Sequence, residues 1–367
     1  MINSYDDIKN FIKDNSFKKI FVLCGKKSFS NSGAEILFQK LFIGKEVKLI
    51  YKNSNIPIVE ELVTIIKTIK EFKPDLFLAI GGGAVIDYAK IANTVDALPN
   101  LAELIINYSY PFKNKLTKLA VIPTTAGSGA EVTSNAVIYV NGIKYSFENE
   151  LLIPDEFFLI PEFLTSAPNK IKASAGFDSI AQAIESLISR KSTERSVEYA
   201  TKSLKLAING FVPFLENPNL NNATEMSIAS NLAGKAINIS KTTAPHAVSY
   251  PFTSLFNISH GHAVSLFFEN FLKFNYENFE KSYISFDLQK RFELIFSLFN
   301  VKDINSLNSK ITLIKKSASL EDNLLKLKID LEKNAQRIIN GVNLLRLGNN
   351  PVKLNDKDIY KIIRKKI

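Results

Sequence analysis

The sequence predicts an α/β unit built on a mostly parallel sheet, followed by an all-helical unit. From residue 1 to residue 160, short β-branched apolar runs alternate with longer segments of helical period, which is typical of βαβ units. After Pro161 the strand-like runs stop, and the apolar residues recur with a helical period. With 367 residues the chain is long enough for two domains. We therefore expect a Rossmann-like α/β domain at residues 1–163 and an all-helical domain at residues 164–367.

Each expected element follows from a local pattern. Short apolar runs predict buried strands at 20–24, 47–51, 76–80 and 118–122. Amphipathic spacing predicts helices between them at 34–43, 59–72 and 84–95. Asn141 and Gly142 suit a two-residue turn, so they predict a hairpin that joins 136–140 to 144–147. In the second unit, helices are expected within 171–189, 194–208, 222–239 and 279–299.

The composition is that of an ordinary globular protein, with 46% hydrophobic and 22% charged residues. No stretch approaches the roughly 18 uncharged apolar residues of a membrane-spanning helix, so no membrane association is expected. The first twenty residues are interrupted by charges such as Asp6 and Lys13, unlike a signal peptide. Cys24 is the only cysteine, so no internal disulfide forms and a cytoplasmic location is expected.

The formal charge of +10 suggests an anionic partner. Nucleic acid is the less favoured one, because the lysines are spread along the chain and no aromatic stacking motif accompanies them. The positive surplus fits an anionic small molecule better.

Three successive glycines, Gly81, Gly82 and Gly83, directly follow the third expected strand and precede a helix. At the carboxyl end of a parallel strand, such glycines let backbone N–H groups approach a pyrophosphate. The alternative is a tight turn without a ligand, and the run is not a G-x-G-x-x-G fingerprint. A second loop at 123–133, rich in Thr, Ser and Gly, follows the next strand. Because the two loops lie at neighbouring strand ends, the sequence favours a nucleotide cleft.

All three histidines of the chain, His246, His260 and His262, fall within one short segment. A buried, hydrogen-bonded histidine is the usual explanation for any one of them, yet this concentration indicates a metal or proton-transfer site. His246 and His260 are too far apart for one helical face, so a shared ion would lie between two helices. 

Upstream, Asp178 and Gln182 stand four residues apart on an expected helix, where they can share one ion. The alternative for this pair is an exposed polar couple on an amphipathic helix. Glu185 is expected to be a helix-surface or interface charge and no ligand.

Four ordered motifs resemble the iron-containing, or group III metal-dependent, alcohol dehydrogenases. They read GGGAVIDYAK, IPTTAGSGAEVTS, AGFDSIAQAIES and PHAVSYPFTSLFNISHGHAV. The segment from Asn349 to Pro351 and the residues after it are similar to the C-terminus of that family, so the resemblance covers almost the whole chain. It implies a nucleotide-binding α/β domain followed by a helical metal-binding domain, in a metal-dependent NAD(P)-linked alcohol dehydrogenase or aldehyde reductase.

The resemblance also implies site residues. Its metal ligands fall on Asp178, Gln182, His246 and His260. Its cofactor positions, with their neighbours in the two loops, fall on Gly82, Gly83, Ala84, Asp87, Thr124, Thr125, Ser128, Thr133 and Lys144.

Two departures from the family pattern affect the chemistry. Most members have a histidine where this chain has Gln182, and an amide oxygen favours Fe²⁺ over Zn²⁺, with Mn²⁺ a further possibility. Most members also have an active-site histidine where this chain has Tyr250. We therefore expect His262, Tyr250 or water to supply the proton.

The run AINISKTTAPHAVSYPFTS resembles the branch of the family that reduces phosphonoacetaldehyde. Lys241, Thr242 and Thr243 stand just before His246, and an ammonium with two hydroxyls suits a phosphonate dianion. The expected reaction is reduction of phosphonoacetaldehyde to 2-hydroxyethylphosphonate, with Lys241 counted among the catalytic residues. The alternative for Lys241 is a helix-end lysine that complements the macrodipole.

The first expected strand is followed by Lys26 and Lys27, which favour the phosphate of NADPH, although NADH stays open. Two other functions remain: a reductase of other small aldehydes, such as lactaldehyde or those of the butanol class, and a lyase similar to dehydroquinate synthase. Family members commonly associate, so a homo-oligomer is expected.

Overall fold

The computed structural model describes residues 2–364, which form two compact units. Unit 1 extends to Ala167 and includes Pro218–Ile228, and unit 2 contains Pro168–Asn217 and the residues from Ala229 onward. The main division thus falls at 167/168, where the sequence suggested 163/164. No sequence pattern indicated that residues 218–228 would join the first unit.

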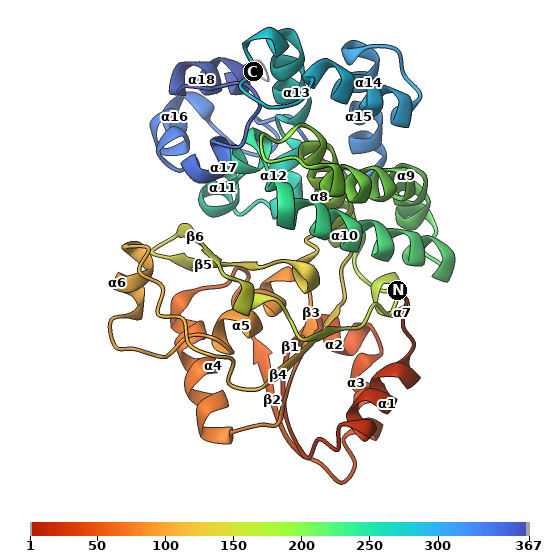
Figure 1. Cartoon of the computed structure of the whole chain (residues 1–367), viewed down its shortest axis with the longest axis vertical. Coiled ribbons are helices and arrows are strands. Elements are labelled where there is room, and N and C mark those ends of the chain that lie inside the picture. Colours follow the sequence, from red (N-terminus) through yellow and green to blue (C-terminus); the bar gives the residue numbers. More distant parts are fainter. Residues whose placement is uncertain (1, 365–367) are drawn as a thin grey trace. The chain divides into compact units, whose positions relative to one another are not determined.

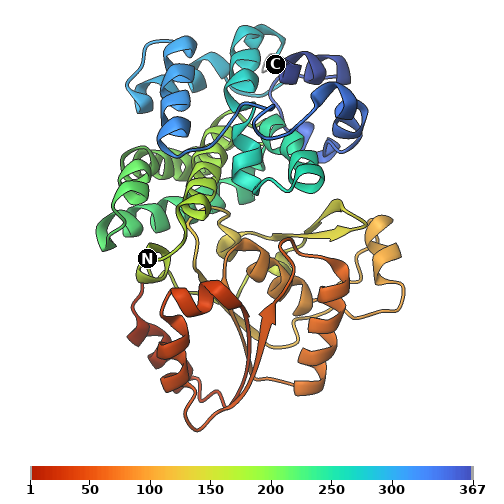
Figure 2. The same ribbon diagram turned by 180° about the vertical axis from the view of Figure 1, so that it is seen from behind.

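Unit 1 is built on a five-stranded parallel sheet with the strand order β2-β1-β3-β4-β7, and Figures 1 and 2 show its helices on both faces. The strands are β1 (Lys19–Gly25), β2 (Glu46–Lys52), β3 (Leu76–Gly81), β4 (Lys118–Pro123) and β7 (Glu156–Phe157). The helices are α1 (Tyr5–Asp14), α2 (Lys26–Asn31), α3 (Ala34–Leu41), α4 (Val59–Phe72), α5 (Gly83–Ala92), α6 (Leu101–Ile106) and α7 (Glu162–Thr165). This arrangement confirms the expected parallel α/β fold.

Alternating residues of β1 face opposite sides of the sheet, as a strand buried on both faces requires. Phe21 and Leu23 pack in a core with α4 and α5, whereas Val22 packs in a second core with α1 and α3. β2 lies on one side of β1, and β3, β4 and β7 lie on the other, so the direction in which strands are added to the sheet switches between β1 and β3. Ligands bind outside the carboxyl ends of the strands at such a switch point, which is where Gly25 and Gly81 lie.

A separate hairpin follows β4 in the chain. It pairs β5 (Asn135–Val140) with β6 (Ile143–Glu148), and its turn places Asn141 and Gly142 at φ 52° and 77°. Both values are positive, as the expected tight turn demands. Two short 3₁₀ turns, Ala130–Val132 and Glu150–Leu152, flank the hairpin.

The named elements of unit 2 are all helices, as expected (Figure 1), and one isolated β-bridge joins Ser282 to Val352. Its helices are α8 (Asn169–Ile188), α9 (Glu194–Glu216), α10 (Leu220–Ser240, whose start belongs to unit 1), α11 (Ala244–Phe256), α12 (His260–Ser265), α13 (Phe268–Glu277), α14 (Leu288–Phe299), α15 (Ile304–Ser317), α16 (Leu331–Asn340), α17 (Leu344–Leu347) and α18 (Asp356–Arg364). One core joins residues of α11, α12, α13, α16 and α18.

Two expectations for the elements were wrong in detail, and one strand was missed. β2 is an edge strand with Leu49 partly exposed, so it is not a buried strand. The helix expected over 279–299 begins only at Leu288, after a 3₁₀ turn at Phe279–Lys281. The two-residue strand β7 was not expected at all. Within residues 2–364, no helix is both long enough and apolar enough to span a bilayer.

Candidate active site

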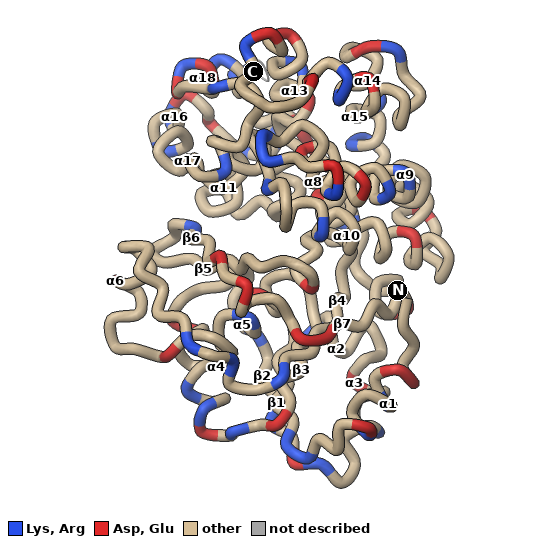
Figure 3. Tube along the Cα trace, viewed as in Figure 1, with Lys and Arg blue, Asp and Glu red and all other residues tan. Residues whose placement is uncertain are grey.

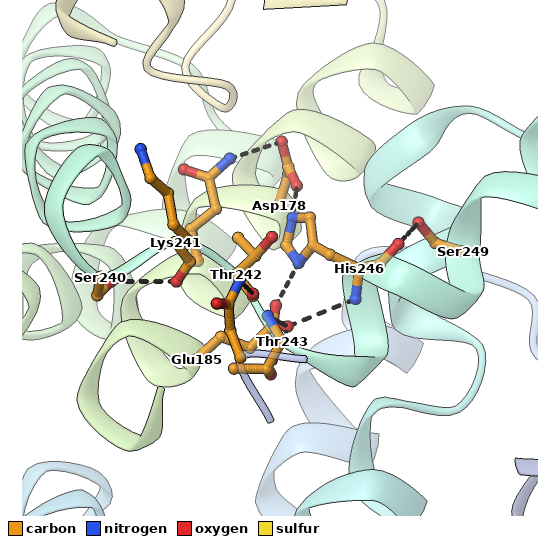
Figure 4. Close-up of polar contacts among 10 residues, drawn as sticks. Asp178, Glu185, Ser240, Lys241, Thr242, Thr243, His246 and Ser249 are labelled. Atoms are coloured by element: carbon orange, nitrogen blue, oxygen red, sulfur yellow. Dashed lines mark hydrogen bonds and ion pairs between the residues drawn. The ribbon is translucent and has the colours of Figure 1, made fainter. Parts of the chain in front are cut away.

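Three potential metal ligands converge in unit 2. One donor atom from each of Asp178, His246 and His260 lies within 4.8 Å of the other two. The Nε2 atom of His246 is 3.1 Å from Oδ1 of Asp178 (Figure 4). The rings of His246 and His260 have centroids 5.4 Å apart. Asp178 and His246 are buried, and His260 is partly exposed. His260 is therefore the least buried of the three.

Three helices position these ligands. Asp178 lies in the middle of α8, His246 in the first turn of α11, and His260 at the first residue of α12. α12 packs against α8 through Gly261, where an added Cβ would lie only 1.9 Å from the carbonyl oxygen of Ser174. Glycine therefore allows the close approach that brings His260 next to Asp178. His246 and His260 come from two different helices, as expected, and Asp178 adds a third.

Gln182 lies one helical turn after Asp178 and is buried beside it, so the pair is not an exposed polar couple. Its Nε2 atom donates to Oδ2 of Asp178 at 3.0 Å. Its Oε1 atom is buried and has no hydrogen-bond partner within residues 2–364. A buried amide oxygen without a partner is costly, and a cation would satisfy it.

Glu185 is the functional residue that the sequence interpretation misplaced. It is fully buried, not a surface charge, and its Oε2 atom contacts Nδ1 of His246. Its Oε1 atom accepts hydrogen bonds from the backbone N–H and the hydroxyl of Thr243, at 2.9 and 2.8 Å, and from the N–H of His246 (Figure 4). A carboxylate placed at the start of α11 also complements its helix dipole. The spacing of seven residues from Asp178 was the available signal, since it places both on one face of α8.

These residues fit a divalent transition metal. Burial alone would lower the pKa of His246, but Glu185 and Asp178 outweigh it and raise the pKa to about 10. The site therefore favours a positive charge at this imidazole, and a cation bound at Nε2 satisfies the same carboxylates. A donor set of one carboxylate, one amide oxygen and two imidazoles suits Fe²⁺ and related ions. The orphaned Oε1 of Gln182 offers such an ion a further oxygen donor beside Asp178.

The two residues proposed for proton transfer differ in their surroundings. The ring of Tyr250 lies beside His260, with centroids 5.8 Å apart. His262 directs its Nε2 atom to the carbonyl oxygen of Glu321 at 2.6 Å, and its atoms are not among the converging ligand atoms. Burial lowers the pKa of His262, which keeps its ring neutral near pH 7.

The three residues proposed to bind a phosphonate are partly engaged in other contacts. The ammonium of Lys241 donates to the carbonyl oxygen of Asn238 at 2.9 Å, the helix-end contact that was the alternative explanation for it. Thr243 is fully buried, and its hydroxyl proton goes to Glu185. Thr242 is buried, and its carbonyl oxygen accepts from Asn349.

In unit 1 the two loops at the carboxyl ends of β3 and β4 touch each other. A Cβ added to Gly82 would lie 3.2 Å from the hydroxyl of Thr125, and one added to Gly83 would lie 2.8 Å from that of Ser128. The backbone N–H of Thr124 also donates to the carbonyl oxygen of Gly81 at 3.0 Å. Glycine is thus needed where the loops meet, and Ala84 follows in the first turn of α5.

Thr124 supplies a further sign of a ligand. Its hydroxyl is buried and has no hydrogen-bond partner in the part of the chain that the structure describes. The start of α5 has no side chain that caps its N–H groups. A glycine cradle, an unsatisfied hydroxyl and free helix N–H groups together fit the phosphates and hydroxyls of a dinucleotide.

The other expected cofactor residues lie around a buried lysine of α5. Thr133 accepts a hydrogen bond from the ammonium of Lys90 at 3.0 Å. Burial raises the pKa of Asp87 to about 6, although the positive charges of Lys90 and Lys144 oppose that change. These side chains form a polar cluster behind the glycine loop.

Two family patterns match nearly the whole chain. The pattern described as "Iron-containing alcohol dehydrogenase" matches residues 2–161, and "Fe-containing alcohol dehydrogenase family, C-terminal" matches residues 172–367. The first covers the glycine and Thr-rich loops, and the second covers all four proposed metal ligands.

Curated relatives are similar over part of their length. The 4-hydroxybutyrate dehydrogenase of Clostridium kluyveri is 30% identical over 259 residues, which are 67% of this chain and 64% of the relative. The phosphonoacetaldehyde reductase of Streptomyces viridochromogenes is 26% identical over 226 residues, which are 59% and 57% of the two chains. The matched segments thus span less than two thirds of either relative.

A solved structure shows the same fold over the full length. The sulfoacetaldehyde reductase of Bifidobacterium kashiwanohense, in complex with NAD⁺, superimposes with a TM-score of 0.86 and 24% identity. The superposition covers 100% of this chain and 95% of that one.

Proposed function

Because the chain belongs to the iron-containing alcohol dehydrogenase family, we propose that it is a metal-dependent, NAD(P)-linked enzyme that interconverts an aldehyde and an alcohol. The observation that carries this proposal is the convergence of Asp178, His246 and His260, with the unsatisfied oxygen of Gln182 beside them. Fe²⁺ is the preferred ion, with Mn²⁺ and Zn²⁺ as alternatives. We propose NADPH as the preferred cofactor over NADH.

The protein's own residues prepare the site. Glu185 accepts the Nδ1 proton of His246, so the Nε2 lone pair of the neutral ring is directed toward the ion position. Thr243 and the first turn of α11 hold Glu185 through its other oxygen. Gly261 allows His260 to reach Asp178. When bound, the divalent ion supplies Lewis acidity to the aldehyde oxygen, and the nicotinamide supplies the hydride.

The proton must reach the oxygen of the product alcohol. Tyr250 lies beside His260, whereas the Nε2 proton of His262 is held by the Glu321 carbonyl oxygen. We therefore assign proton delivery to Tyr250, directly or through water, in preference to His262.

The finer proposal for the substrate is phosphonoacetaldehyde, reduced to 2-hydroxyethylphosphonate. It is supported by Lys241 and Thr242 just before the ligand His246, and by similarity to the reductase named above. Binding a phosphonate requires the ammonium of Lys241 to exchange the carbonyl oxygen of Asn238 for a phosphonate oxygen. Such a charge-assisted hydrogen bond is worth about 1.5–3 kcal/mol.

One observation favours a second candidate, a reductase of small uncharged aldehydes. The hydroxyl proton of Thr243 and the ammonium of Lys241 both have partners within the protein, which leaves fewer donors for an anion. Under this alternative, the only role of Lys241 is to donate a hydrogen bond to a carbonyl oxygen in the last turn of α10.

The experiment is anaerobic reconstitution with Fe²⁺, Mn²⁺ or Zn²⁺, followed by assays with phosphonoacetaldehyde and propanal and with each nicotinamide. We expect metal-dependent reduction that consumes one NAD(P)H per aldehyde. Catalytic use of the nicotinamide without net consumption would instead support the lyase alternative. Inactivity with every metal, aldehyde and nicotinamide would contradict the proposal.

A further inference from the structure

The fold assembles a basic cavity that is not evident along the sequence. A cavity of about 940 Å³ in unit 1 is lined by residues of α1, the loop before β1, the end of α3 and the start of β2. Its lining contains six lysines and a single acidic residue, Glu46. The lysines are Lys9, Lys13, Lys18, Lys19, Lys40 and Lys45.

This cavity is separate from the cofactor loops of the same unit. Lys19 and Glu46 pair in register at the first residues of the parallel strands β1 and β2, so the cavity lies at the amino ends of these strands. The glycine and Thr-rich loops follow the carboxyl ends of β3 and β4. Figure 3 shows Lys and Arg concentrated where the chain enters β1 and β2.

Most of the lining lysines have no anionic partner. Lys19 forms an ion pair with Glu46 at 3.2 Å, and Lys45 donates to the carbonyl oxygen of Phe17. Among the described residues, no carboxylate lies within 4.0 Å of the ammonium groups of Lys9, Lys13, Lys18 or Lys40. These four ammonium groups therefore form no ion pair within residues 2–364.

Few negative groups lie in or directly beside the lining of the cavity. Asp75 accepts hydrogen bonds from the backbone N–H groups of Lys18 and Lys19, and Glu46 adds a second carboxylate. The C-terminal ends of α1 and α3 contribute about half a negative charge each. The lining itself carries six ammonium groups and one carboxylate, so it has a net positive charge.

We propose that this cavity binds a small polyanion with several linked phosphate groups. Lysine ammonium groups bind phosphate as point charges, and several of them around one cavity favour multiply charged over singly charged ligands. The volume lies within the range of about 300–1,000 Å³ typical of small-molecule sites. An inorganic phosphate chain and a nucleoside triphosphate both contain the linked phosphate groups that the cavity would bind.

The test is calorimetric titration of the full chain with tripolyphosphate, at low and at physiological ionic strength. The test variant is K13Q/K40Q, which removes two unpartnered charges of the cavity. The matched control is K67Q/K205Q, which removes two exposed helix lysines elsewhere. We expect saturable binding that weakens about tenfold in K13Q/K40Q, stays unchanged in the control, and falls with added salt.

Chelation of a bound metal by tripolyphosphate would give the same heat in both variants, so it is distinguished from binding in the cavity. Absence of saturable binding, or equal weakening in the two variants, would overturn the proposal. A parallel titration with ATP, at saturating NADPH to block the cofactor loops, identifies the source. If ATP and tripolyphosphate bind with equal affinity, the cavity recognises only the phosphate chain. If ATP binds more tightly, the cavity also recognises the nucleoside.

Discussion

The carboxylate of Glu185 contacts Nδ1 of His246 and, through its other oxygen, accepts two hydrogen bonds from Thr243. A fully buried acid near the end of α8 thus fixes the ring orientation of a proposed metal ligand in the first turn of α11. Hydrogen-bond partners of this kind orient a ligating imidazole and raise its basicity.

Replacing Glu185 with glutamine tests this relationship. Glutamine preserves the shape of the side chain but removes the charge that holds the imidazole, so we expect about 10–100-fold weaker metal binding. The measurement is Mn²⁺ titration followed by electron paramagnetic resonance. Glu216→Gln, an exposed position on α9, is the control and should bind metal like the parent chain. Unchanged affinity in Glu185→Gln would contradict the assigned role.

Replacing Gln182 with histidine should change which ion the site prefers. The substitution exchanges a neutral oxygen donor for an imidazole nitrogen, which Zn²⁺ accepts more readily. We expect the ratio of Zn²⁺ to Mn²⁺ affinity to rise about tenfold or more, as measured by competition between the two ions. An unaltered ratio would mean that residue 182 does not contact the ion.

Gly261 permits the contact between α8 and α12, so Gly261→Ala should damage both stability and metal binding. The added methyl group would lie 1.9 Å from the Ser174 carbonyl oxygen, and backbone at that distance must move. We expect a loss of about 1–3 kcal/mol in the free energy of unfolding, measured in urea, together with weaker metal binding. Gly348→Ala, whose nearest contact is 3.4 Å away, should be close to neutral.

The two candidates for proton delivery can be separated by substitution. His262→Gln can still donate to the Glu321 carbonyl oxygen, so we expect kcat within about threefold of the parent chain. Tyr250→Phe loses the hydroxyl, and we expect kcat to fall about a hundredfold. A large loss in His262→Gln with an altered pH profile of kcat, and none in Tyr250→Phe, would reverse the assignment.

Lys241 decides between the two substrate classes. Its backbone is left-handed at φ 60°, a conformation that asparagine tolerates better than most residues, so Lys241→Asn removes the ammonium with little strain. If Lys241 binds a phosphonate, kcat/KM for phosphonoacetaldehyde should fall about tenfold or more, while that for propanal stays unchanged. Equal, modest changes for both aldehydes would favour the reductase of uncharged aldehydes.

The sequence predicted the proposed metal ligands where residue types able to bind a metal also stand at helical spacing. Asp178 and Gln182 share a helix face because of their spacing, and the scarcity of histidine made the pairing of His246 with His260 conspicuous. The loops after β3 and β4 could be expected to meet because parallel strands end at one edge of a sheet.

Other features depend on tertiary packing that no local pattern reveals. In the sequence, Glu185 looks like a charged residue on a helix surface. Its burial depends on α11, which packs Thr243 and His246 against its carboxylate. β2 resembles a buried strand, but the strand order leaves it at the edge. The lysines of the basic cavity are dispersed along the first 45 residues and come together only when α1, α3 and β1 fold.

Anomalous X-ray scattering at the iron absorption edge, from crystals of the chain reconstituted with Fe²⁺, tests the central claim most directly. We predict one strong peak per chain, within bonding distance of Asp178, Gln182, His246 and His260. A peak elsewhere, or none among these side chains in crystals that contain stoichiometric iron, would contradict the metal site and the chemistry derived from it.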